Sequence, residues 1–301
     1  MLPPVVKLPP KDTKIVVAYG GGVNTIALIL LLWKLGVIPQ AIVMANPGHE
    51  WKATLRYRDE IMRPWLKAHG FPDVTVVQRW DQGLPPRGTT KWTETLGEEC
   101  FRVATIPSVA FPPGKKCSIK FKADPQRWWI ARQPWAMEEW AAGRKIAKAI
   151  GYDADEDHRI RPDFGDAWEH ARMFPWYPVY DAEMDRAACE RLILQYLPFL
   201  PRKSACVWCP NNTLQDWVDA QNEEPEAFEY AVAMSQRAQN YIEKPEFVGL
   251  LRGVRGEAGK QLPTRQLHEA VEIVDGLYRL KQSIARLACS GEEEMPCDCK
   301  V

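Results

Sequence analysis

The cysteines are the residues of this chain with the clearest spacing for metal or redox chemistry. Cys206 and Cys209 form a Cys-x-x-Cys pair, and two thiolates at that spacing can bind one metal ion or cluster, or form a redox disulfide. Cys100 and Cys117 lie in a long segment without helical or strand periodicity, which could fold back toward the pair. Four cysteines would complete a [4Fe–4S] or zinc site, whereas three would leave one iron of a cluster open.

A glycine run is the second feature with a chemical meaning. Gly20, Gly21 and Gly22 end a short apolar segment and lead through Asn24 and Thr25 into a helix-like run. Glycines let the backbone approach an anion closely, and the start of a helix directs N–H groups and the positive end of its dipole at that anion. The run is neither a Walker A motif nor a dinucleotide fingerprint, because it lacks Gly-Lys-Ser/Thr and its glycines are contiguous. It predicts a phosphate-binding loop, the alternative being a plain glycine-rich turn.

The elements that must position these residues alternate in type along the first part of the chain. Apolar, β-branched runs predict strands over residues 14–19, 39–45 and 74–78, and helical periodicity predicts helices over residues 26–35 and 54–69. Such alternation is typical of a parallel α/β sheet, whose binding sites lie at the carboxyl ends of the strands. The glycine run follows the first strand, so we expect it at that edge.

The rest of the chain is predicted to hold one long irregular segment and several helices. A loop as long as residues 79–122 is more often functional than a plain connection. Residues 126–149 look helical and rich in tryptophan, with a short strand over residues 145–150 ahead of an acidic loop. Further helices are predicted over residues 185–197, 224–242 and 265–287.

Together these elements predict an α/β fold, a three-layer sandwich with a mostly parallel sheet and a helical C-terminal extension. The predicted α/β domain spans residues 11–220, and the extension spans residues 221–289. Residues 290–301 are expected to form a flexible tail, since chain ends are usually mobile unless they are tied down.

Four motifs in the same order resemble those of a known family. Gly20-Gly-Gly-Val-Asn-Thr25 resembles the pyrophosphate-binding loop, Ser-Gly-Gly-x-Asp-Ser, of the PP-loop, adenine-nucleotide alpha-hydrolase-like enzymes, which include ATP pyrophosphatases and phosphoadenylylsulfate (PAPS) reductases. Ala45-Asn-Pro-Gly-His-Glu50 stands where PAPS reductases carry Asp-Thr-Gly. Cys117-Ser-Ile-Lys-Phe-Lys122 and Ser204-Ala-Cys-Val-Trp-Cys-Pro210 resemble their Cys-x-x-Lys-x-Lys and Cys-x-x-Cys-Pro segments. The resemblance covers about residues 14–217 and is closest to the PAPS reductase-like proteins of phage and mobile elements.

The resemblance implies a Rossmann-like fold and a set of ligands. The nucleotide would be ATP or PAPS, with Mg²⁺ as a further candidate. The residues implied to bind it are Tyr19, Gly20, Gly21, Gly22, Asn24, Thr25, Asn46, Gly48 and His49. A [4Fe–4S] cluster, with Zn²⁺ as the alternative, would be held by Cys100, Cys117, Cys206 and Cys209. Asn24 departs from the Asp of the family pattern, and Gly20 departs from its Ser.

Charged residues near these motifs are candidates for catalysis. Lys120 belongs to a basic cluster around Cys117 that could neutralise phosphate and lower thiol pKa values, unless it is only a solvated loop. Lys120 and Lys122 alternate with apolar residues, so they are predicted to share one face. Glu156 and Arg159 follow a predicted strand, and related proteins place a Glu/Arg pair there near the substrate.

The remaining cysteines fall into two groups. Cys297 and Cys299 lie in the acidic tail, where they could form a redox pair or a sulfur relay, or have no chemical role; a mobile cysteine near the C-terminus is what sulfate-reducing members use. Cys189 and Cys289 lie in apolar helical patterns and are expected to be buried as small hydrophobic residues.

Composition bounds the class of protein further. The chain has 301 residues, with Lys+Arg and Asp+Glu both at 39 and a net charge of zero. This balance argues against a polybasic partner surface, although it leaves room for one local basic pocket. The most hydrophobic stretch, residues 26–33, is far shorter than the roughly 20 residues that span a bilayer. Residues 1–10 show no signal peptide, so we expect a cytoplasmic protein with no membrane partner.

The sequence leaves three functional hypotheses. The leading one is a PAPS reductase-like PP-loop enzyme that binds an adenine nucleotide and uses the iron–sulfur cluster in sulfur transfer or reduction, with a thiol electron donor or sulfur-donor protein as partner. The second is ATP-dependent adenylation or thiolation of a nucleic acid, as in tRNA thiolation or DNA phosphorothioation enzymes. The third is a non-enzymatic, zinc-stabilised nucleotide-binding module. A homo-oligomer is compatible with all three.

Overall fold

The fold is described from a computed structural model, which covers residues 6–79, 94–107 and 116–239 together with Leu250, Gly276 and Arg279. The chain divides into two compact units, one formed by Met1–Leu96 and Lys116–Cys206 and the other by Gly97–Lys115 and Val207–Val301. Apart from Gly276 and Arg279, the helix predicted over residues 265–287 lies outside the described residues, as does the cysteine-bearing tail. The domain limits predicted at residues 220 and 289 therefore stay predictions.

The first unit is built on a five-stranded, fully parallel sheet with the strand order β3-β2-β1-β4-β5. Its strands are β1 (Ile15–Tyr19), β2 (Ala41–Ala45), β3 (Val74–Val77), β4 (Ile146–Ile150) and β5 (Met173–Trp176). Strands buried on both faces read as continuous apolar runs, which is why the sequence shows the first four. The topology confirms the predicted α/β fold.

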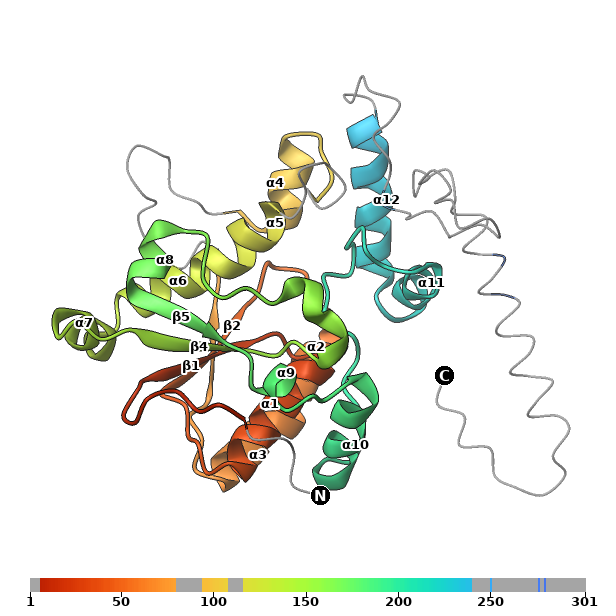
Figure 1. The fold of residues 1–301 in the computed structure, drawn as a ribbon. Coiled ribbons are helices and arrows are strands. Elements are labelled where there is room, and N and C mark those ends of the chain that lie inside the picture. The colour runs from red at the N-terminus through yellow and green to blue at the C-terminus, as the bar shows by residue number, and fades with distance from the viewer. Residues whose placement is uncertain are drawn as a thin grey trace, which may run out of the picture. The chain divides into compact units, whose positions relative to one another are not determined.

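Helices cover both faces of this sheet (Figure 1). The helical segments of the first unit are α1 (Val23–Lys34), α2 (Lys52–Arg56), η1 (Tyr57–Met62), α3 (Arg63–Ala68), α5 (Lys116–Ser118), η4 (Ile119–Ala123), α6 (Asp124–Ala131), α7 (Pro134–Ala141), η5 (Ala154–Arg159), α8 (Ala167–Arg172), α9 (Pro178–Asp181) and α10 (Arg186–Tyr196). The element α4 (Leu96–Arg102) begins at the last residue of the unit's first segment.

Alternate residues of each strand enter two separate hydrophobic cores. Val17 and Tyr19 of β1 pack with α1, α3 and α10, whereas Val16 packs with Ile130 of α6 and Ala136 of α7. This period of two is what a strand buried on both sides requires. The unit is therefore a three-layer sandwich of helices, sheet and helices, as predicted.

The chain reverses its direction of travel across the sheet between β1 and β4. From β1 it moves outward to β2 and β3, then returns to β4 and continues to β5. In open α/β sheets, ligands bind outside the carboxyl ends of the strands at such a switch point. The glycine run follows β1, and η5 follows β4, so both border this position.

Two π-helical segments each precede a helix with a proline in its first turn. η1 leads into α3, which has Pro64 at its start, and η4 leads into α6, which has Pro125. A proline inside a helix lacks an N–H and its ring clashes with the carbonyl four residues before it. The wider π turn accommodates that clash, so the helical path predicted over residues 54–69 continues across Pro64.

The structure differs from the sequence-based expectation in three places. Residues 79–122 were expected to be irregular, yet they contain α4 and α5. The helix expected over residues 126–149 is two helices and a strand, because Pro134 starts a new helix after Gln133. The strand β5 was missed, since it has four residues and one of them is Pro175.

The second unit is helical in its described part. It contains α11 (Leu214–Glu223) and α12 (Pro225–Gln239), and the predicted helix over residues 224–242 matches the latter. Thr213 and Asp216 form a capping box at the start of α11. The Trp208 ring stacks on Tyr230 with centroids 5.1 Å apart, so aromatic contacts join the cysteine-bearing segment to α12.

No helix among the described residues is both long enough and apolar enough to cross a membrane.

Gly151, which follows β4, makes a close approach that can be tested. A methyl group added there would lie 2.7 Å from the backbone oxygen of Asn24 and 2.8 Å from its carbonyl carbon. Backbone cannot move aside cheaply, so Gly151→Ala should lower the free energy of unfolding by about 1–3 kcal/mol. Denaturant titration measures this loss.

The matched control is Gly165→Ala, because nothing lies within 4 Å of the methyl group that it would add. The control should unfold at the same denaturant concentration as the parent chain. Equal stability of both variants would show that β4 and the start of α1 are not packed this closely.

Candidate functional site

The glycine run forms a tight turn at the carboxyl end of the central strand β1. Gly21 has a φ of +76°, a conformation that residues with a side chain rarely adopt. A methyl group added to it would lie 2.7 Å from Cγ2 of Thr54 and 3.4 Å from Cε1 of Tyr19. The loop therefore packs closely on the buried side chains of Tyr19 and Thr54, and only a glycine fits at position 21.

The helix that follows this turn begins without a capping side chain. Gly22 is the N-cap of α1, no side chain caps that end, and the first turn contains no acidic residue. Thr25 accepts a hydrogen bond from the Gly20 N–H, at 3.4 Å, which closes the loop on itself. A helix start of this kind offers N–H groups and a positive dipole end to an anion.

A segment from far along the chain lies against the loop. Methyl groups added at Gly22 and Gly20 would lie 3.3 Å from Cβ and 3.7 Å from Oγ of Ser204. The preceding residue, Lys203, has an exposed side chain. Ser204 was predicted only as part of the cysteine motif, and nothing local in the sequence indicated that it neighbours the glycine loop.

Asn24 connects the loop to the turn after β4. Its Nδ2 donates to Oδ2 of Asp153 at 2.9 Å and to Oε2 of Glu156 at 3.0 Å. Its Oδ1 accepts from Nη1 of Arg186 at 3.4 Å. The predicted residues Asn24 and Glu156 therefore meet in the structure, and Asp153 joins them although the sequence analysis had not singled it out.

The two carboxyl groups differ in their surroundings. Asp153 is 4% exposed; burial raises its pKa, and the hydrogen bond from Asn24 acts in the opposite direction. Glu156 forms an ion pair with Arg159. The Arg159 guanidinium lies 3.9 Å from the centroid of the Tyr152 ring, so the predicted pair Glu156–Arg159 is formed and braced by an aromatic ring.

The predicted residues after β2 form a compact turn. Oδ1 of Asn46 accepts from the Gly48 N–H at 2.9 Å, and Gly48 has a φ of +107°. His49 is partly buried. Tyr19 is 2% exposed and belongs to the core beneath the loop. Its hydroxyl has no hydrogen-bond partner among the described residues.

The lysine motif takes a different form from the one expected. Lys120 and Lys122 were predicted to share one face, but they lie in the π-helical turn η4, where residues two apart point in different directions. Phe121 between them is buried and Ile119 is exposed. Lys122 pairs with Glu50, while Lys120 lies 5.8 Å from the Phe121 ring.

The four predicted metal ligands are divided between the two units. Cys117 and Cys206 belong to the first unit, and Cys100 and Cys209 to the second; all four carry thiols rather than disulfides. Among the described residues, no group of three or more His, Cys, Asp or Glu side chains is arranged to hold a metal ion. The iron–sulfur cluster, and zinc as its alternative, therefore stay predictions.

The other cysteines add little to the site. Cys297, Cys299 and Cys289 lie outside the described residues. Cys189 on α10 is fully buried against the core, as expected. Burial raises the pKa of its thiol to about 12, so it remains protonated and acts as an apolar side chain.

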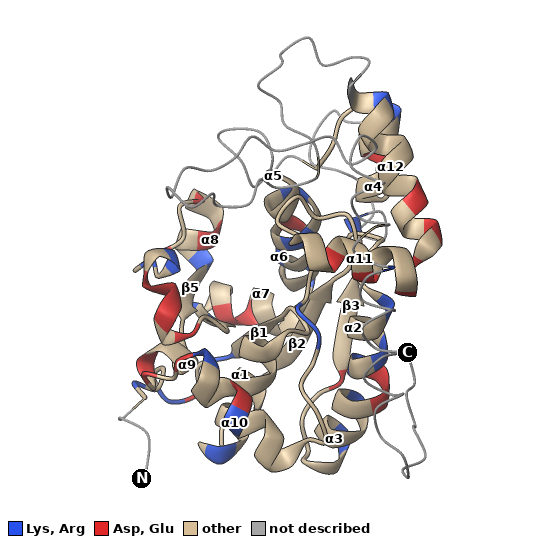
Figure 2. Cartoon of the chain, turned by 90° about the vertical axis from the view of Figure 1, so that its right-hand side faces the viewer, with Lys and Arg blue, Asp and Glu red and all other residues tan. Residues whose placement is uncertain are grey.

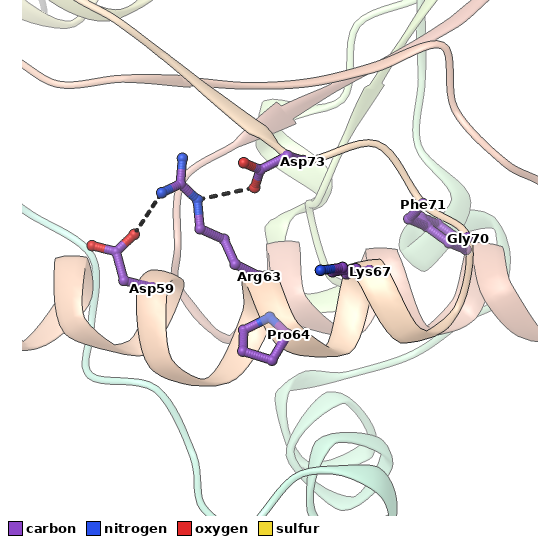
Figure 3. A pocket seen from close by; sticks show the side chains of 7 residues that line it. All are labelled: Asp59, Arg63, Pro64, Lys67, Gly70, Phe71 and Asp73. Atoms are coloured by element: carbon purple, nitrogen blue, oxygen red, sulfur yellow. Dashed lines mark ion pairs between the residues drawn. The ribbon is translucent and has the colours of Figure 1, made fainter.

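A pocket lies beside α3 and the segment that leads into β3, at the amino end of that strand (Figure 3). It has a volume of about 630 Å³. Arg63 reaches between Asp59 and Asp73 there, with ion pairs of 3.4 and 2.9 Å. None of the residues that line this pocket belongs to the glycine loop or to the turn after β4.

Basic and acidic residues are interspersed over the described helices on the side that Figure 2 shows. Basic and acidic residues, of which the chain has 39 each, are thus mixed on this side of the described structure, and Figure 2 shows no extended basic face there. Arg186 supplies one positive charge next to the glycine loop, through its hydrogen bond to Asn24.

Comparisons with known proteins assign no family. No family model and no curated protein matches the chain. Among solved structures, it resembles the U34-tRNA thiolase NcsA from Methanococcus maripaludis with its [4Fe–4S] cluster, at 12% sequence identity and a TM-score of 0.32, over 77% of this chain and 73% of that chain. A likeness at this level carries no argument, so the geometry of the site has to support any functional assignment.

The contact between Asn24 and the two carboxyl groups predicts the effect of restoring an acid at this position. Asn24→Asp would place three carboxylates within hydrogen-bonding distance and remove both donors. We expect a loss of about 1–3 kcal/mol in the free energy of unfolding in EDTA. Mg²⁺ should recover part of it, because carboxylates bind that ion. Denaturant titrations with EDTA and with Mg²⁺ measure both effects.

Asn24→Ala is the control, since it removes the hydrogen bonds without adding a charge. It should be more stable than Asn24→Asp in EDTA and should gain nothing from Mg²⁺. If Asn24→Asp is as stable as the parent chain in EDTA, the amide does not bridge the two carboxyl groups.

The position of Lys203 predicts a contribution to phosphate binding. Lys203 has an exposed side chain and directly precedes Ser204, which contacts the loop, so we expect its charge to favour an anion bound there. Lys203→Met should weaken ATP binding about tenfold, as the loss of one charge-assisted hydrogen bond would. Calorimetric titration measures the affinity. Lys67→Met, which removes an exposed charge at the opposite edge, should leave it unchanged; equal effects would refute the assignment.

Proposed function

We propose that this protein is a PP-loop enzyme of the ATP pyrophosphatase type, which adenylates an acceptor as preparation for sulfur transfer. The observation that supports this most is the uncapped start of α1 at the carboxyl end of the central strand, preceded by Gly21 with its positive φ. A polyphosphate is the ligand that such a loop suits best. Its place beside the switch point between β1 and β4 agrees with the usual location of nucleotide sites.

The charges beside the loop favour ATP over PAPS. Asp153 and Glu156 lie within hydrogen-bonding distance of Asn24, in the first turn of α1. Two carboxylates repel an anionic nucleotide unless a divalent cation comes with it. Mg²⁺ commonly binds through one or two carboxylates together with the phosphates of a substrate, so this donor set fits Mg²⁺ once ATP supplies further oxygens.

In the proposed reaction an oxygen of the acceptor attacks the α-phosphorus of ATP. The bond from that phosphorus to the β-phosphate oxygen breaks, AMP is joined to the acceptor, and pyrophosphate leaves. The N–H groups of the loop would bind the leaving pyrophosphate, and Lys203 and Thr25 would add donors to it. Mg²⁺, when bound, would supply further charge neutralisation. A sulfur nucleophile would then displace AMP in a second step.

The acceptor that we favour is a group in a nucleic acid, which was the alternative hypothesis from the sequence. PAPS reduction, the leading hypothesis there, stays a prediction, because its expected attacking cysteines, Cys297 and Cys299, lie outside the described residues. The two reactions differ in the nucleotide that they need, so binding measurements separate them.

Removing a carboxylate should weaken ATP binding only when Mg²⁺ is present. With Mg²⁺ present, Asp153→Asn and Glu156→Gln should each weaken ATP binding about tenfold, because a ligand for the cation is lost. In EDTA the same variants should bind ATP no more weakly than the parent chain, since a repulsive charge has gone. Calorimetric titration under both conditions gives the affinities.

The control is Glu138→Gln, which removes an exposed carboxylate from α7, and it should change neither affinity. Tighter binding of PAPS than of Mg²⁺-bound ATP by the parent chain would overturn the proposed function. Incubation with ATP and candidate acceptors should yield pyrophosphate and the adenylated acceptor, and AMP should be released only when a sulfur nucleophile is added. Formation of ADP would contradict an α-phosphorus attack.

A further inference from the structure

One buried carboxylate that the proposed reaction does not use lies where three motifs meet. The side chain of Glu50 is 1% exposed. Its Oε1 accepts from the hydroxyl of Ser204 at 3.2 Å, and its Oε2 lies 3.1 Å from Nζ of Lys122. An ionised carboxyl group removed from water requires such partners, because an unpaired one would be strongly unfavourable.

The backbone reinforces the first of these contacts. Glu50 forms an isolated antiparallel bridge with Cys206, and the Trp51 N–H donates to the oxygen of Ala205 at 3.4 Å. The guanidinium of Arg202 lies 3.6 Å from the centroid of the Trp51 ring. The segment from Arg202 to Cys206 is therefore attached to the turn after β2 along its length.

This attachment determines where Ser204 lies on the glycine loop. A methyl group added at Gly22 would be 3.3 Å from Cβ of Ser204, so the two segments are already in contact. Ser204 has a rotatable hydroxyl, and the hydrogen bond to Glu50 fixes its direction. If Ser204 moved by even a fraction of an ångström, the space open to a phosphate at this loop would change.

The second contact ties a helix to the same carboxylate. Lys122 lies in η4, directly after the buried Phe121. Its pairing with Glu50 balances the buried charge and holds the turn after β2 from the other side. Loss of the carboxylate would release both the segment from Arg202 to Cys206 and this helical turn.

We propose that Glu50 is a positioning residue, which holds Ser204 against the glycine loop and so sets the affinity of that loop for pyrophosphate groups. The proposal rests on the proposed function in one respect, since it takes the loop to be a polyphosphate site. It assigns the effect of Glu50 to the phosphate end of the ligand and leaves the adenosine end unaffected.

The experiment compares Glu50→Gln, Glu50→Leu and Ser204→Ala by calorimetry with pyrophosphate, ATP and adenosine. Glu50→Leu should weaken pyrophosphate and ATP binding about tenfold and leave adenosine binding unchanged. Glu50→Gln keeps an oxygen for Ser204, so its loss should be smaller. The double variant Glu50→Leu with Ser204→Ala should bind pyrophosphate no more weakly than Glu50→Leu alone, because the two residues act through one contact.

A second measurement follows the attachment itself without any ligand. Amide hydrogen exchange should become faster at residues 46–51 and 202–206 in both Glu50 variants and stay unchanged over residues 146–150 of β4. Glu60→Gln, an exposed carboxylate on η1, is the control and should change neither exchange nor affinity. Unchanged exchange and affinity in this control would show that the loss of one negative charge does not by itself cause the effects seen in the Glu50 variants.

The outcomes separate this inference from the function on which it rests. If the parent chain binds neither pyrophosphate nor ATP, the proposed function fails, and hydrogen exchange alone decides the role of Glu50. If the parent chain binds both, then a folded Glu50→Leu with parental pyrophosphate affinity refutes the inference, as would an additive double variant. Unchanged exchange at residues 202–206 in both variants would refute it as well.

Discussion

The arrangement of the site depends on how closely the start of α1 approaches the chain after β4. Only a glycine fits at position 151, since a methyl group added there would lie 2.7 Å from the backbone oxygen of Asn24. Because β1 and β4 are neighbours in the sheet, the elements that leave their carboxyl ends are forced together at the switch point. Asn24 then meets Asp153 and Glu156, which come from the other side of that contact. The polar site is a consequence of backbone packing.

The sequence predicted the parts of the fold that local patterns determine. Apolar runs predicted β1 to β4, and the helix over residues 26–35 was found as α1, since buried parallel strands and helices carry their own periodicity. Patterns of this kind gave no sign of β5, where Pro175 interrupts a run of only four residues. They also failed for η4, where the alternation of Lys120 and Lys122 with apolar residues predicted one shared face, but the chain turns as a π helix ahead of Pro125.

Contacts between distant segments explain what the sequence could not predict about the site. The motifs around Gly20, Glu50 and Ser204 were each recognised, but nothing local indicated that Ser204 would lie on the loop with Glu50 behind it. Asp153 was overlooked because a carboxylate in an acidic run looks like a solvated surface, whereas here it is 4% exposed. Asp153 belongs to the site because it accepts a hydrogen bond from Asn24, which is 129 positions away in the chain. A contact between such distant residues is set by the order of the strands and cannot be predicted from local sequence.

The same contact explains why an amide can stand at position 24. The PP-loop pattern that the sequence resembles has an aspartate there, and an aspartate beside Asp153 and Glu156 would need a cation to hold the three acids together. The amide of Asn24 supplies two donors, one for each carboxylate, and its oxygen accepts from Arg186. All of its hydrogen-bonding groups point to partners in the described structure. The departure from the pattern thus keeps the acidic pair assembled beside the loop before any cation arrives, so binding of a metal–nucleotide complex would not have to pay for bringing like charges together.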